Sequence, residues 1–539
     1  MKKILTFIIL LILITSCSSK QQVELIVTNG NIYTVDDHFQ KAEAFAVNNG
    51  KFIAVGSNTD ILKKFKTKKI IDAKNKTIVP GLIDAHCHFY GLGNYMQLVD
   101  ASGTNSFNEV IERIVDFQKE KKTEFILGRG WDQNDWEIKE YPTKDTLDLL
   151  YPKTPVAIRR IDGHAMLVNQ AALDLAGINY NTKVEGGEII KKDGKITGVL
   201  IDNAMNLVDR TIPKGSTQQA IQALKDAEKY CFNLGLTTVD DAGLDKTTID
   251  LIDSLQQIGE LKMRIYAMVS ANKNNLDYYL KNGIIKTDRL NVRSFKFYAD
   301  GALGSRGAAL KKPYSDRENH FGALVNNLQT TKETAKKIAN SDFQMNTHAI
   351  GDSANSFLLK TYAEVLKDKP DRRWRIEHAQ VISPEDFKYF NDIIPSIQPT
   401  HATSDMYWAE DRLGSERIKG AYAYKQLLNK YGKVALGTDF PVEKVNPMLT
   451  FYAAVARKDV KGYPEKGFQS EDALSKEETL KGMTIWAAYA NFEENEKGSI
   501  ETGKLADFII LEEDIMEIDL KKIPELKVLE TWLGGEKVK

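Results

Sequence analysis

The sequence predicts an α/β fold, in which a closed (β/α)8 barrel of the TIM type is joined to a small β-sandwich domain. Along the middle of the chain, segments with the residue pattern of buried strands alternate with segments of helical periodicity. Eight of these predicted strands can be counted. Both chain ends consist of short alternating strands and turns. A long interval after the first barrel strand does not fit the repeat and predicts an insertion.

The first 22 residues form a separate segment. Two lysines precede a mostly apolar run from Ile4 to Ile14, and Thr15-Ser16-Cys17 follows, which is the layout of a secretory signal peptide. A helix of this length rises only about 16 Å, about half of a bilayer core. The run Ile14 to Cys17 also resembles a bacterial lipobox. We therefore expect residues 1–17 to be a lipoprotein signal peptide, Cys17 to carry the lipid and residues 18–22 to form a tether; a plain signal peptide is the alternative.

Both chain ends contribute to the expected small β domain. Residues 23–78 include "VELIVTNGNIYTVDD" and "AEAFAVNNGKFIAVGS", alternating runs broken by Asn-Gly turns. Residues 491–539 include "GSIETGKLADFIILEED", which has the same texture. Chain termini commonly lie close together, so one domain built from both ends is expected.

The barrel is expected over residues 79–490, with an insertion over about 95–225. The eight predicted strands are "TIVPGLIDAHCHF" from residue 77 and then residues 235–243, 261–269, 291–301, 343–352, 372–380, 393–401 and 432–442. Helical segments such as "STQQAIQALKDAEKYCFNLG" separate them. We expect the insertion to form a lid or wall over the barrel mouth.

Composition excludes some classes of partner. Lys plus Arg number 73 and Asp plus Glu number 74, so the charge gives no argument for a nucleic-acid partner. Beyond the leader only Cys87 and Cys231 remain, and two cysteines in so long a chain make no disulfide framework. The oligomeric state is left open.

Potential metal ligands gather at the ends of the predicted strands. His86 and His88 are two residues apart on the first strand and share a face, while Cys87 between them points the other way and is expected to be a packed thiol. Strands four to eight carry, in order, Lys296, His348, His378, His401 and Asp439. In such a barrel these ends meet at one mouth, where active sites form.

The chain resembles the metal-dependent amidohydrolase superfamily. The motifs are "PGLIDAHCHF", "FYADGALGSRGA", "THAIGD", "IEHAQ" and "LGTDFPV", in this order, with "GRGWDQNDW" and "RIDGHAMLVN" in the insertion. They look specifically like its family-3 branch, which includes N-substituted formamide deformylases and YtcJ-like proteins. The resemblance covers essentially residues 23–539.

The resemblance implies a set of ligands for one or two divalent metals, with zinc expected and iron, manganese or nickel as alternatives. By that resemblance, His86 and His88 bind one metal, and His348 and His378 bind the second. Lys296, N-carboxylated by carbon dioxide, bridges the two. The alternative is that Lys296 snorkels or pairs with Asp300, and a single-metal site is the fallback. Asp439 is expected both to bind metal and to act as general base and acid.

Other residues are weaker candidates for contacts to a substrate. They are Trp131, Asp132 and His164 in the insertion and Arg306 and His401 at the barrel mouth. For each of these, a purely structural role is equally open. Asp84 is two residues before His86 and could orient a ligand imidazole.

The sequence thus predicts a hydrolase that uses metal-activated water to cleave a non-peptide C–N bond, of the amide type, in a small molecule. Hydrolysis of a related ester, carbamate or cyclic amide is the alternative reaction. A binding lipoprotein that keeps barrel and metal as structure is the alternative class. The lipid anchor predicts an exported protein on a bacterial membrane, facing the periplasm or the cell surface.

Overall fold

The computed structural model describes residues 20–213 and 215–539, so the predicted signal peptide and Cys17 lie outside the described residues. Two compact units are formed. The first contains the chain up to Cys87, Cys231–Asp245 and Met263–Lys539; the second contains His88–Tyr230 and Lys246–Lys262. Within the described ranges, no helix combines the length and the apolar character needed to cross a bilayer.

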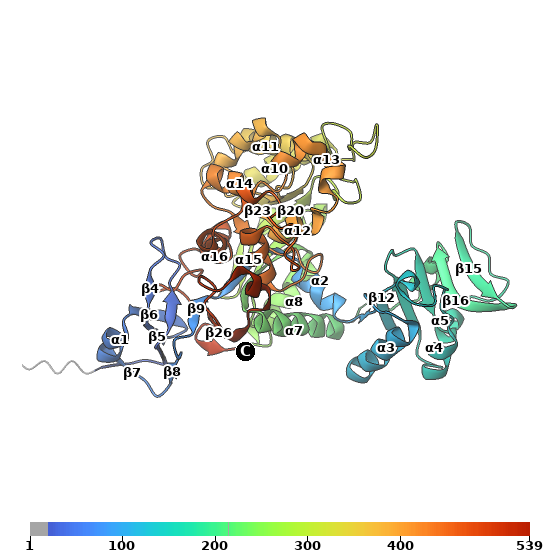
Figure 1. Cartoon of the computed structure of the whole chain (residues 1–539), viewed down its shortest axis with the longest axis horizontal. Helices are drawn as coiled ribbons and strands as arrows, with labels where there is room; N and C mark the ends of the chain where they lie inside the picture. Colours follow the sequence, from blue (N-terminus) through green and yellow to red (C-terminus); the bar gives the residue numbers. More distant parts are fainter. Residues whose placement is uncertain (1–19, 214) are drawn as a thin grey trace, which may run out of the picture. The chain divides into compact units, whose positions relative to one another are not determined.

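Eight parallel strands form the barrel of the first unit (Figure 1), as the sequence predicts. In spatial order they are β10 (Leu82–Cys87), β17 (Leu236–Leu244), β18 (Arg264–Ser270), β20 (Leu290–Tyr298), β21 (Gln344–Ala349), β22 (Arg375–His378), β23 (Ile394–Ile397) and β24 (Ala435–Leu436). The short β19 (Ile285–Lys286) pairs antiparallel with β20. The chain beyond β24 closes the barrel, because the backbone N–H of Asp439 donates to the carbonyl of His86 at 2.8 Å.

Helices separate the barrel strands along the chain. They are α7 (Thr217–Asn233), α8 (Lys246–Gln257), α9 (Lys273–Asn282), α10 (Leu328–Ala339), α11 (Asp352–Val365), α12 (Pro399–Asp405), α13 (Ala409–Arg417), α14 (Tyr424–Tyr431), α15 (Pro447–Ala456), α16 (Lys476–Gly482) and α17 (Ile485–Ala490). The seventh predicted strand is too long by four residues, since β23 ends at Ile397. Pro399 starts α12 there, because its fixed φ suits the first turn of a helix.

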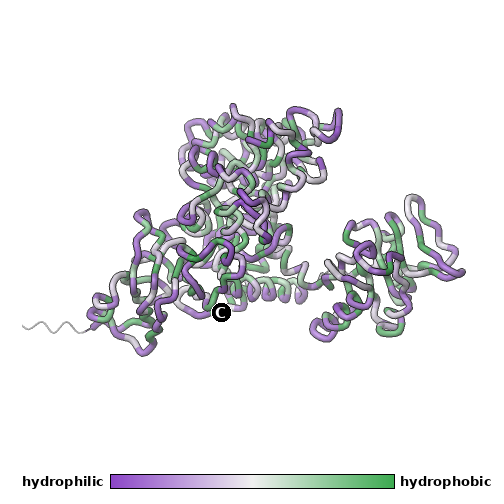
Figure 2. The backbone as a smooth tube through the Cα atoms, viewed as in Figure 1, coloured by the Kyte–Doolittle hydropathy of each residue, from purple (hydrophilic) through white to green (hydrophobic). Residues whose placement is uncertain are grey.

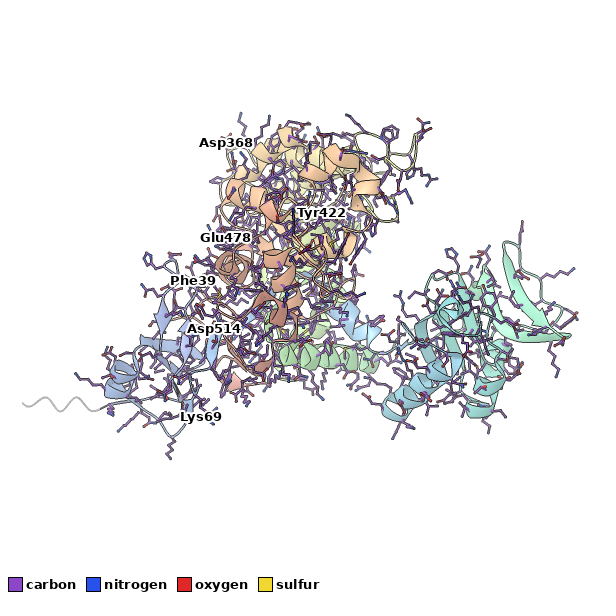
Figure 3. The ribbon with its side chains drawn as sticks, in the orientation of Figure 1. Phe39, Lys69, Asp368, Tyr422, Glu478 and Asp514 are labelled. Atoms are coloured by element: carbon purple, nitrogen blue, oxygen red, sulfur yellow. The ribbon has the colours of Figure 1, made fainter. Side chains whose placement is uncertain are left out.

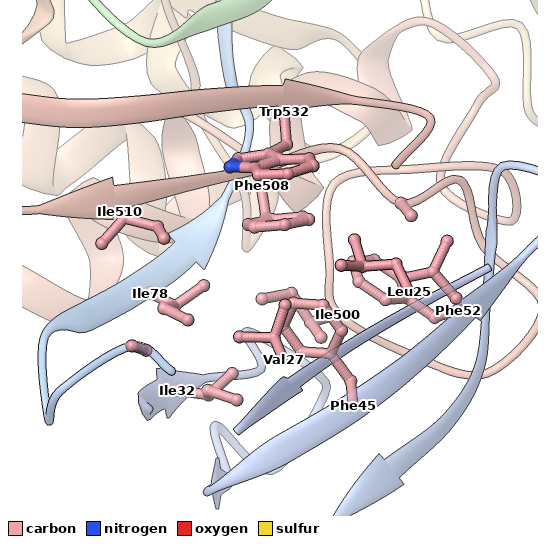
Figure 4. Close-up of a cluster of buried hydrophobic side chains, with 13 residues drawn as sticks. Leu25, Val27, Ile32, Phe45, Phe52, Ile78, Ile500, Phe508, Ile510 and Trp532 are labelled. Atoms are coloured by element: carbon pink, nitrogen blue, oxygen red, sulfur yellow. The ribbon is translucent and has the colours of Figure 1, made fainter. Parts of the chain in front are cut away.

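The small β domain draws strands from both chain ends. One sheet has the order β6 (Lys51–Gly56), β5 (Ala44–Asn48), β2 (Leu25–Thr28) and β8 (Ile70–Asp72). The other has the order β27 (Glu536–Lys537), β26 (Val528–Leu533), β25 (Phe508–Leu511), β9 (Thr77–Pro80), β3 (Asn31–Tyr33) and β4 (Lys41–Ala42). The aromatic rings of Phe45, Phe508 and Trp532 lie in the core of this domain (Figure 4), where Phe508 and Trp532 stack at 5.4 Å.

A polar contact also joins the two chain ends. The carboxylate of Asp514 (Figure 3) accepts hydrogen bonds from the side-chain amide of Asn31 at 2.7 Å and from the hydroxyl of Tyr33 at 3.0 Å. Together with the antiparallel pairing of β25 with β9, this contact fixes the C-terminal segment on the N-terminal one.

The insertion has its own sheet and core. Its strands are β11 (Val99–Asp100), β12 (Ile126–Trp131), β13 (Val156–Arg160), β14 (Ala165–Val168), β16 (Lys195–Asp202) and β15 (Gly187–Lys192), in that spatial order. Its helices are α2 (Phe89–Tyr95), α3 (Phe107–Lys121), α4 (Asp145–Leu150), α5 (Gln170–Leu175) and α6 (Met205–Asp209). Buried apolar side chains pack against the sheet, and the far end of the β15–β16 hairpin is largely hydrophilic (Figure 2).

Candidate metal centre

His86 lies at the centre of a cluster of polar side chains inside the barrel. Its side chain is fully buried on β10, and its Nδ1 is 2.5 Å from Oε2 of Glu377. Its Nε2 is 2.9 Å from Nζ of Lys296 and 3.7 Å from Oδ1 of Asp439. An imidazole that donates Nδ1–H to a buried carboxylate presents Nε2 as a lone-pair donor, which is the form that binds metal.

Two groups of potential ligand atoms share Asp439. His86, His88 and Asp439 form one group, and His378, His401 and Asp439 form the other; within each group the ligand atoms lie within 4.8 Å of one another. His88 is the residue directly after β10, and Asp439 follows β24. Two imidazoles and a carboxylate are a suitable donor set for zinc and for other divalent transition metals.

His348 and His378 are on the neighbouring strands β21 and β22. Their ring centroids are 4.5 Å apart. Nε2 of His348 and Nδ1 of His378 are buried, and neither has a hydrogen-bond partner among the described residues. Burial, and then Lys296, lower the pKa of His348 to about 3, and burial lowers the pKa of His378 well below its usual value. Buried neutral imidazoles with an unpaired nitrogen are expensive unless a metal binds them, so these residues fit a metal site.

Lys296 is buried on β20 among these groups. Burial lowers its pKa, and the described residues place no carboxylate within ion-pair distance of its ammonium group. Asp300 does not pair with it. The carboxylate of Asp300 instead accepts three backbone N–H bonds, from Ala309, Ile350 and Gly351. The structure therefore does not support the alternative of a Lys296–Asp300 ion pair.

Glu377 is the residue that the sequence analysis missed. It precedes His378 on β22, is fully buried, and holds the imidazole of His86. Asp84, expected to orient that imidazole, instead accepts bonds from the backbone N–H of His86 at 3.2 Å and from Thr438. Asp84 thus fixes the backbone of β10 against that of β24, and Glu377 orients the ring. Cys87 points away from the cluster towards the carbonyl of Asp240, and burial raises the pKa of its thiol.

His401 lies beside Asp439, although α12 and not a strand carries it. Its Nε2 is 3.3 Å from Oδ2 of Asp439, and its Nδ1 is 3.1 Å from Oε1 of Glu443. Burial would lower its pKa, but the two carboxylates raise it to about 10. This placement lets His401 face either a metal or a group bound beside Asp439.

The remaining substrate candidates have structural partners. The guanidinium group of Arg306 donates two hydrogen bonds, of 3.1 and 2.8 Å, to the carboxylate of Asp316 in the same loop. In the insertion, Trp131 is 1% exposed and its indole N–H donates to the carbonyl of Ile158 at 2.7 Å. Trp131 is thus enclosed in the core of the insertion with its only donor bonded, and its contact with a substrate stays a prediction.

Asp132 and His164 are polar residues of the same unit. Asp132 accepts a bond from the backbone N–H of Asn134 at 2.9 Å and pairs with Arg160. His164 is exposed, and Nδ1 of its ring is 2.8 Å from Asp202, which raises its pKa. Both contacts order loops, and a role for either residue in binding a substrate stays a prediction.

The sequence and the fold match known proteins over most of their lengths. A family model for the amidohydrolase family matches residues 69–539. The chain is 34% identical to Protein LONG AFTER FAR-RED 3 of Arabidopsis thaliana, over 96% of this chain and 91% of that one. It is 31% identical to the putative amidohydrolase YtcJ of Bacillus subtilis, over 94% and 98%. It is 24% identical to the N-substituted formamide deformylase of Arthrobacter pascens, over 96% and 98%.

A solved structure has the same architecture. An uncharacterized metal-dependent hydrolase from Pyrococcus furiosus superposes with a TM-score of 0.76 at 27% identity, covering 92% of this chain and 100% of that one. The match of the family model over most of the chain, the relatives and this fold agree with the cluster of buried imidazoles around Asp439. The chain belongs to the amidohydrolase family and is a metal-dependent hydrolase.

Proposed function

We propose that this hydrolase cleaves a non-peptide C–N bond, of the amide type, in a small molecule. The observation that carries the proposal is the cluster in which the imidazoles of His86, His88, His378 and His401 lie around one carboxylate, Asp439, at the end of the barrel strands. A purely structural metal site needs no such spare carboxylate beside its ligands. The name of the Arthrobacter pascens relative indicates that it acts on N-substituted formamides, and this chemistry supports an amide as the substrate.

The residues that would hold metal are His86, His88, Lys296, His348, His378 and Asp439. We propose zinc, in one or two ions per chain. When bound, the metal supplies a Lewis acid that polarises a carbonyl group and lowers the pKa of water to about 7. Burial lowers the pKa of the imidazoles of His86, His348 and His378, which favours the neutral form that binds metal, and Glu377 orients the ring of His86.

Lys296 can serve as a ligand only after its charge is removed. Its Nζ lies 2.9 Å from Nε2 of His86, and an ammonium group has no lone pair to offer a metal. We propose that the neutral amine attacks carbon dioxide, so that an N–C bond forms and one proton leaves. The resulting carbamate carries two oxygen ligands and one negative charge, which suit a dication.

Asp439 is proposed as the general base and acid. Its carboxylate removes a proton from water as the oxygen attacks the carbonyl carbon, and it then delivers the proton to the leaving nitrogen. His401 lies within 3.3 Å of the carboxylate of Asp439, and contact between its ring and a substrate bound beside Asp439 is part of the proposal. Hydrolysis of an ester, carbamate or cyclic amide uses the same groups and is the alternative reaction.

Export and lipid anchoring through Cys17 remain part of the proposal. The supporting observation is the sequence of the first 17 residues alone. Labelling with a radioactive or alkynyl fatty acid in a bacterial host, compared between the natural chain and a Cys17→Ser variant, tests it. A label that persists in the variant would refute anchoring at this residue.

Metal content and turnover test the reaction. The chain lacking residues 1–17 and its Asp439→Asn variant are analysed for metals and assayed with N-formyl and N-acyl amines. We expect about two metals per chain and loss of hydrolysis in a variant that keeps metal. One metal with full activity would remove the bridging carbamate. No metal and no turnover after purification in metal-supplemented buffer would favour a binding protein.

A further inference from the structure

A side pocket lies next to His401 in the first unit. Its volume is about 340 Å³, which is within the range of small-molecule sites. Three segments line it: α12 with the turn after it, the turn that follows Asp439, and α15 with the loop after it. None of the roles assigned above uses this pocket.

Two side chains, Glu443 and His401, lie between the pocket and Asp439. Glu443 lines the pocket, and its Oε1 is 3.1 Å from Nδ1 of His401 and accepts a hydrogen bond from Oγ of Ser404 at 2.6 Å. Nε2 of the same imidazole is 3.3 Å from Asp439. The carboxylate of Glu443 and the ring of His401 therefore separate the pocket from the proposed general base, which places the pocket two side chains away from the proposed reaction.

The walls of the pocket are apolar and held in place. Tyr452 is buried at its floor, while Tyr407 and Val460 expose 58% and 67% of their surfaces. The ring of Tyr407 stacks on that of Tyr463, with centroids 5.6 Å apart and planes 11° apart, and its hydroxyl donates to Asp459. Asp459 also accepts two backbone N–H bonds of 2.9 Å from its own loop. These contacts fix a flat apolar wall against which an aromatic or aliphatic group can pack.

Lysines surround this apolar wall. Lys444, Lys458 and Lys461 line the pocket, and the described residues give none of them a carboxylate within ion-pair distance. The two acids of the pocket are already used, since Glu443 accepts from His401 and Ser404, and Asp459 accepts from Tyr407 and its own loop. The pocket thus offers an apolar surface and three ammonium groups to whatever enters it.

We propose that this pocket binds the non-reacting end of the substrate, and that this end is an apolar or aromatic group that carries a carboxylate or another anion. The inference rests on the proposed amide hydrolysis for the position of the scissile bond. It extends the proposed function by naming which part of the substrate confers recognition. Glu443 and His401 mark the boundary between the reacting bond and the recognised end.

Three matched compounds test the proposal: N-formylbenzylamine, its 4-carboxy derivative and the methyl ester of that derivative. Binding is measured by calorimetry on full-length Asp439→Asn protein, and kcat and KM are measured on the natural chain. The test variant carries Lys444→Gln, Lys458→Gln and Lys461→Gln. The control carries Lys281→Gln, Lys336→Gln and Lys337→Gln, which remove the same charge from α9 and α10.

The carboxylated compound should bind the natural chain at least about 5-fold more tightly than the ester, from several weak contacts between exposed charges. The test variant should lose this preference, through KM and not kcat, while the control keeps it. The preference should also decrease between about 50 and 500 mM salt. Equal binding of the three compounds, or a preference that survives in the test variant, would overturn the proposal. Absence of turnover with lysine-dependent binding would instead refute the amide hydrolysis and leave the pocket assignment standing.

Discussion

Replacing Glu377 with glutamine should weaken metal binding through its effect on His86. The carboxylate lies 2.5 Å from Nδ1 of the imidazole, and both side chains are fully buried. A hydrogen bond to a charged group contributes about 1.5–3 kcal/mol and a neutral one about 0.5–1.5 kcal/mol, so the substitution removes about 1–2 kcal/mol of support for the metal-binding tautomer. Metal affinity should therefore fall by about 10-fold, at the lower end of the 10- to 100-fold loss typical of such partners.

Competition with a fluorescent chelator measures this affinity directly, without turnover. Asp84→Asn is the matched control, because Asp84 is equally buried in the same barrel but bonds the backbone of His86 and not its ring. That variant should be less stable to urea and should bind metal nearly as well as the natural chain. Unchanged affinity in Glu377→Gln, or the same loss in both variants, would refute the role given to Glu377.

Three further predictions concern stability. Asp507→Asn should lower the free energy of unfolding in urea by about 3–5 kcal/mol, because it leaves the buried guanidinium of Arg264 without its two-point carboxylate partner; an unchanged midpoint would count against this. Burial alone would raise the pKa of Glu493, but the ammonium groups of two neighbouring lysines lower it to about 2. The stability of the natural chain relative to Glu493→Gln should therefore be constant above pH of about 4.5 and shrink as the pH falls towards 2, whereas a difference independent of pH would reject the pairing. Trp131→Phe should destabilise the insertion by about 1 kcal/mol, because its indole N–H bond to a buried carbonyl is lost, and hydrogen exchange on β12 and β13 would report it; unchanged protection would contradict the core placement.

Much of the barrel follows from sequence pattern because buried parallel strands leave a strong signal. Runs such as "VALGTD" are apolar enough to be recognised as strands, and the ligand candidates come at their ends. A small β domain built from both chain ends is also predicted by their shared alternating pattern, but the pairing of β25 with β9 is not, because the pattern places residues 77–80 in the first barrel strand. The residue at which β23 ends cannot be predicted from the sequence pattern, because Pro399 fits the edge of a strand and the first turn of a helix equally well.

Residues whose role depends on partners far away in sequence escape such reasoning. Trp131 stands next to Asp132 in a motif that looks functional, but its burial is set by side chains up to 70 residues away in the core cluster. Glu377 has the role that spacing alone suggests for Asp84. The signal for Glu377 was present as an acid inside an apolar strand, since such a residue is rarely buried without a partner.

Backbone conformation explains why adjacent residues of β22 both reach the centre. Strict alternation along a strand would send Glu377 and His378 to opposite faces. His378 has a φ of 72°, in the left-handed region that residues other than glycine rarely adopt, and it is the last residue of the strand. This break in alternation allows Glu377 to hold His86 while the ring of His378 lies 4.9 Å from that of His86.

The same unusual conformation recurs at Asp439, whose φ is 64°. A non-glycine residue in this region costs about 1 kcal/mol or more, and such residues persist only where the surroundings hold them. Here the backbone N–H of Asp439 is held by the carbonyl of His86 and Thr438 is held by Asp84, so β10 and the end of β24 impose the conformation together. The strained residues of the barrel mouth thus include both His378 and Asp439, which belong to the same group of potential metal ligands. These two left-handed conformations lower the stability of the fold and direct the side chains of His378 and Asp439 towards the centre. A protein that kept the barrel only as a scaffold would have no physical reason to retain either conformation.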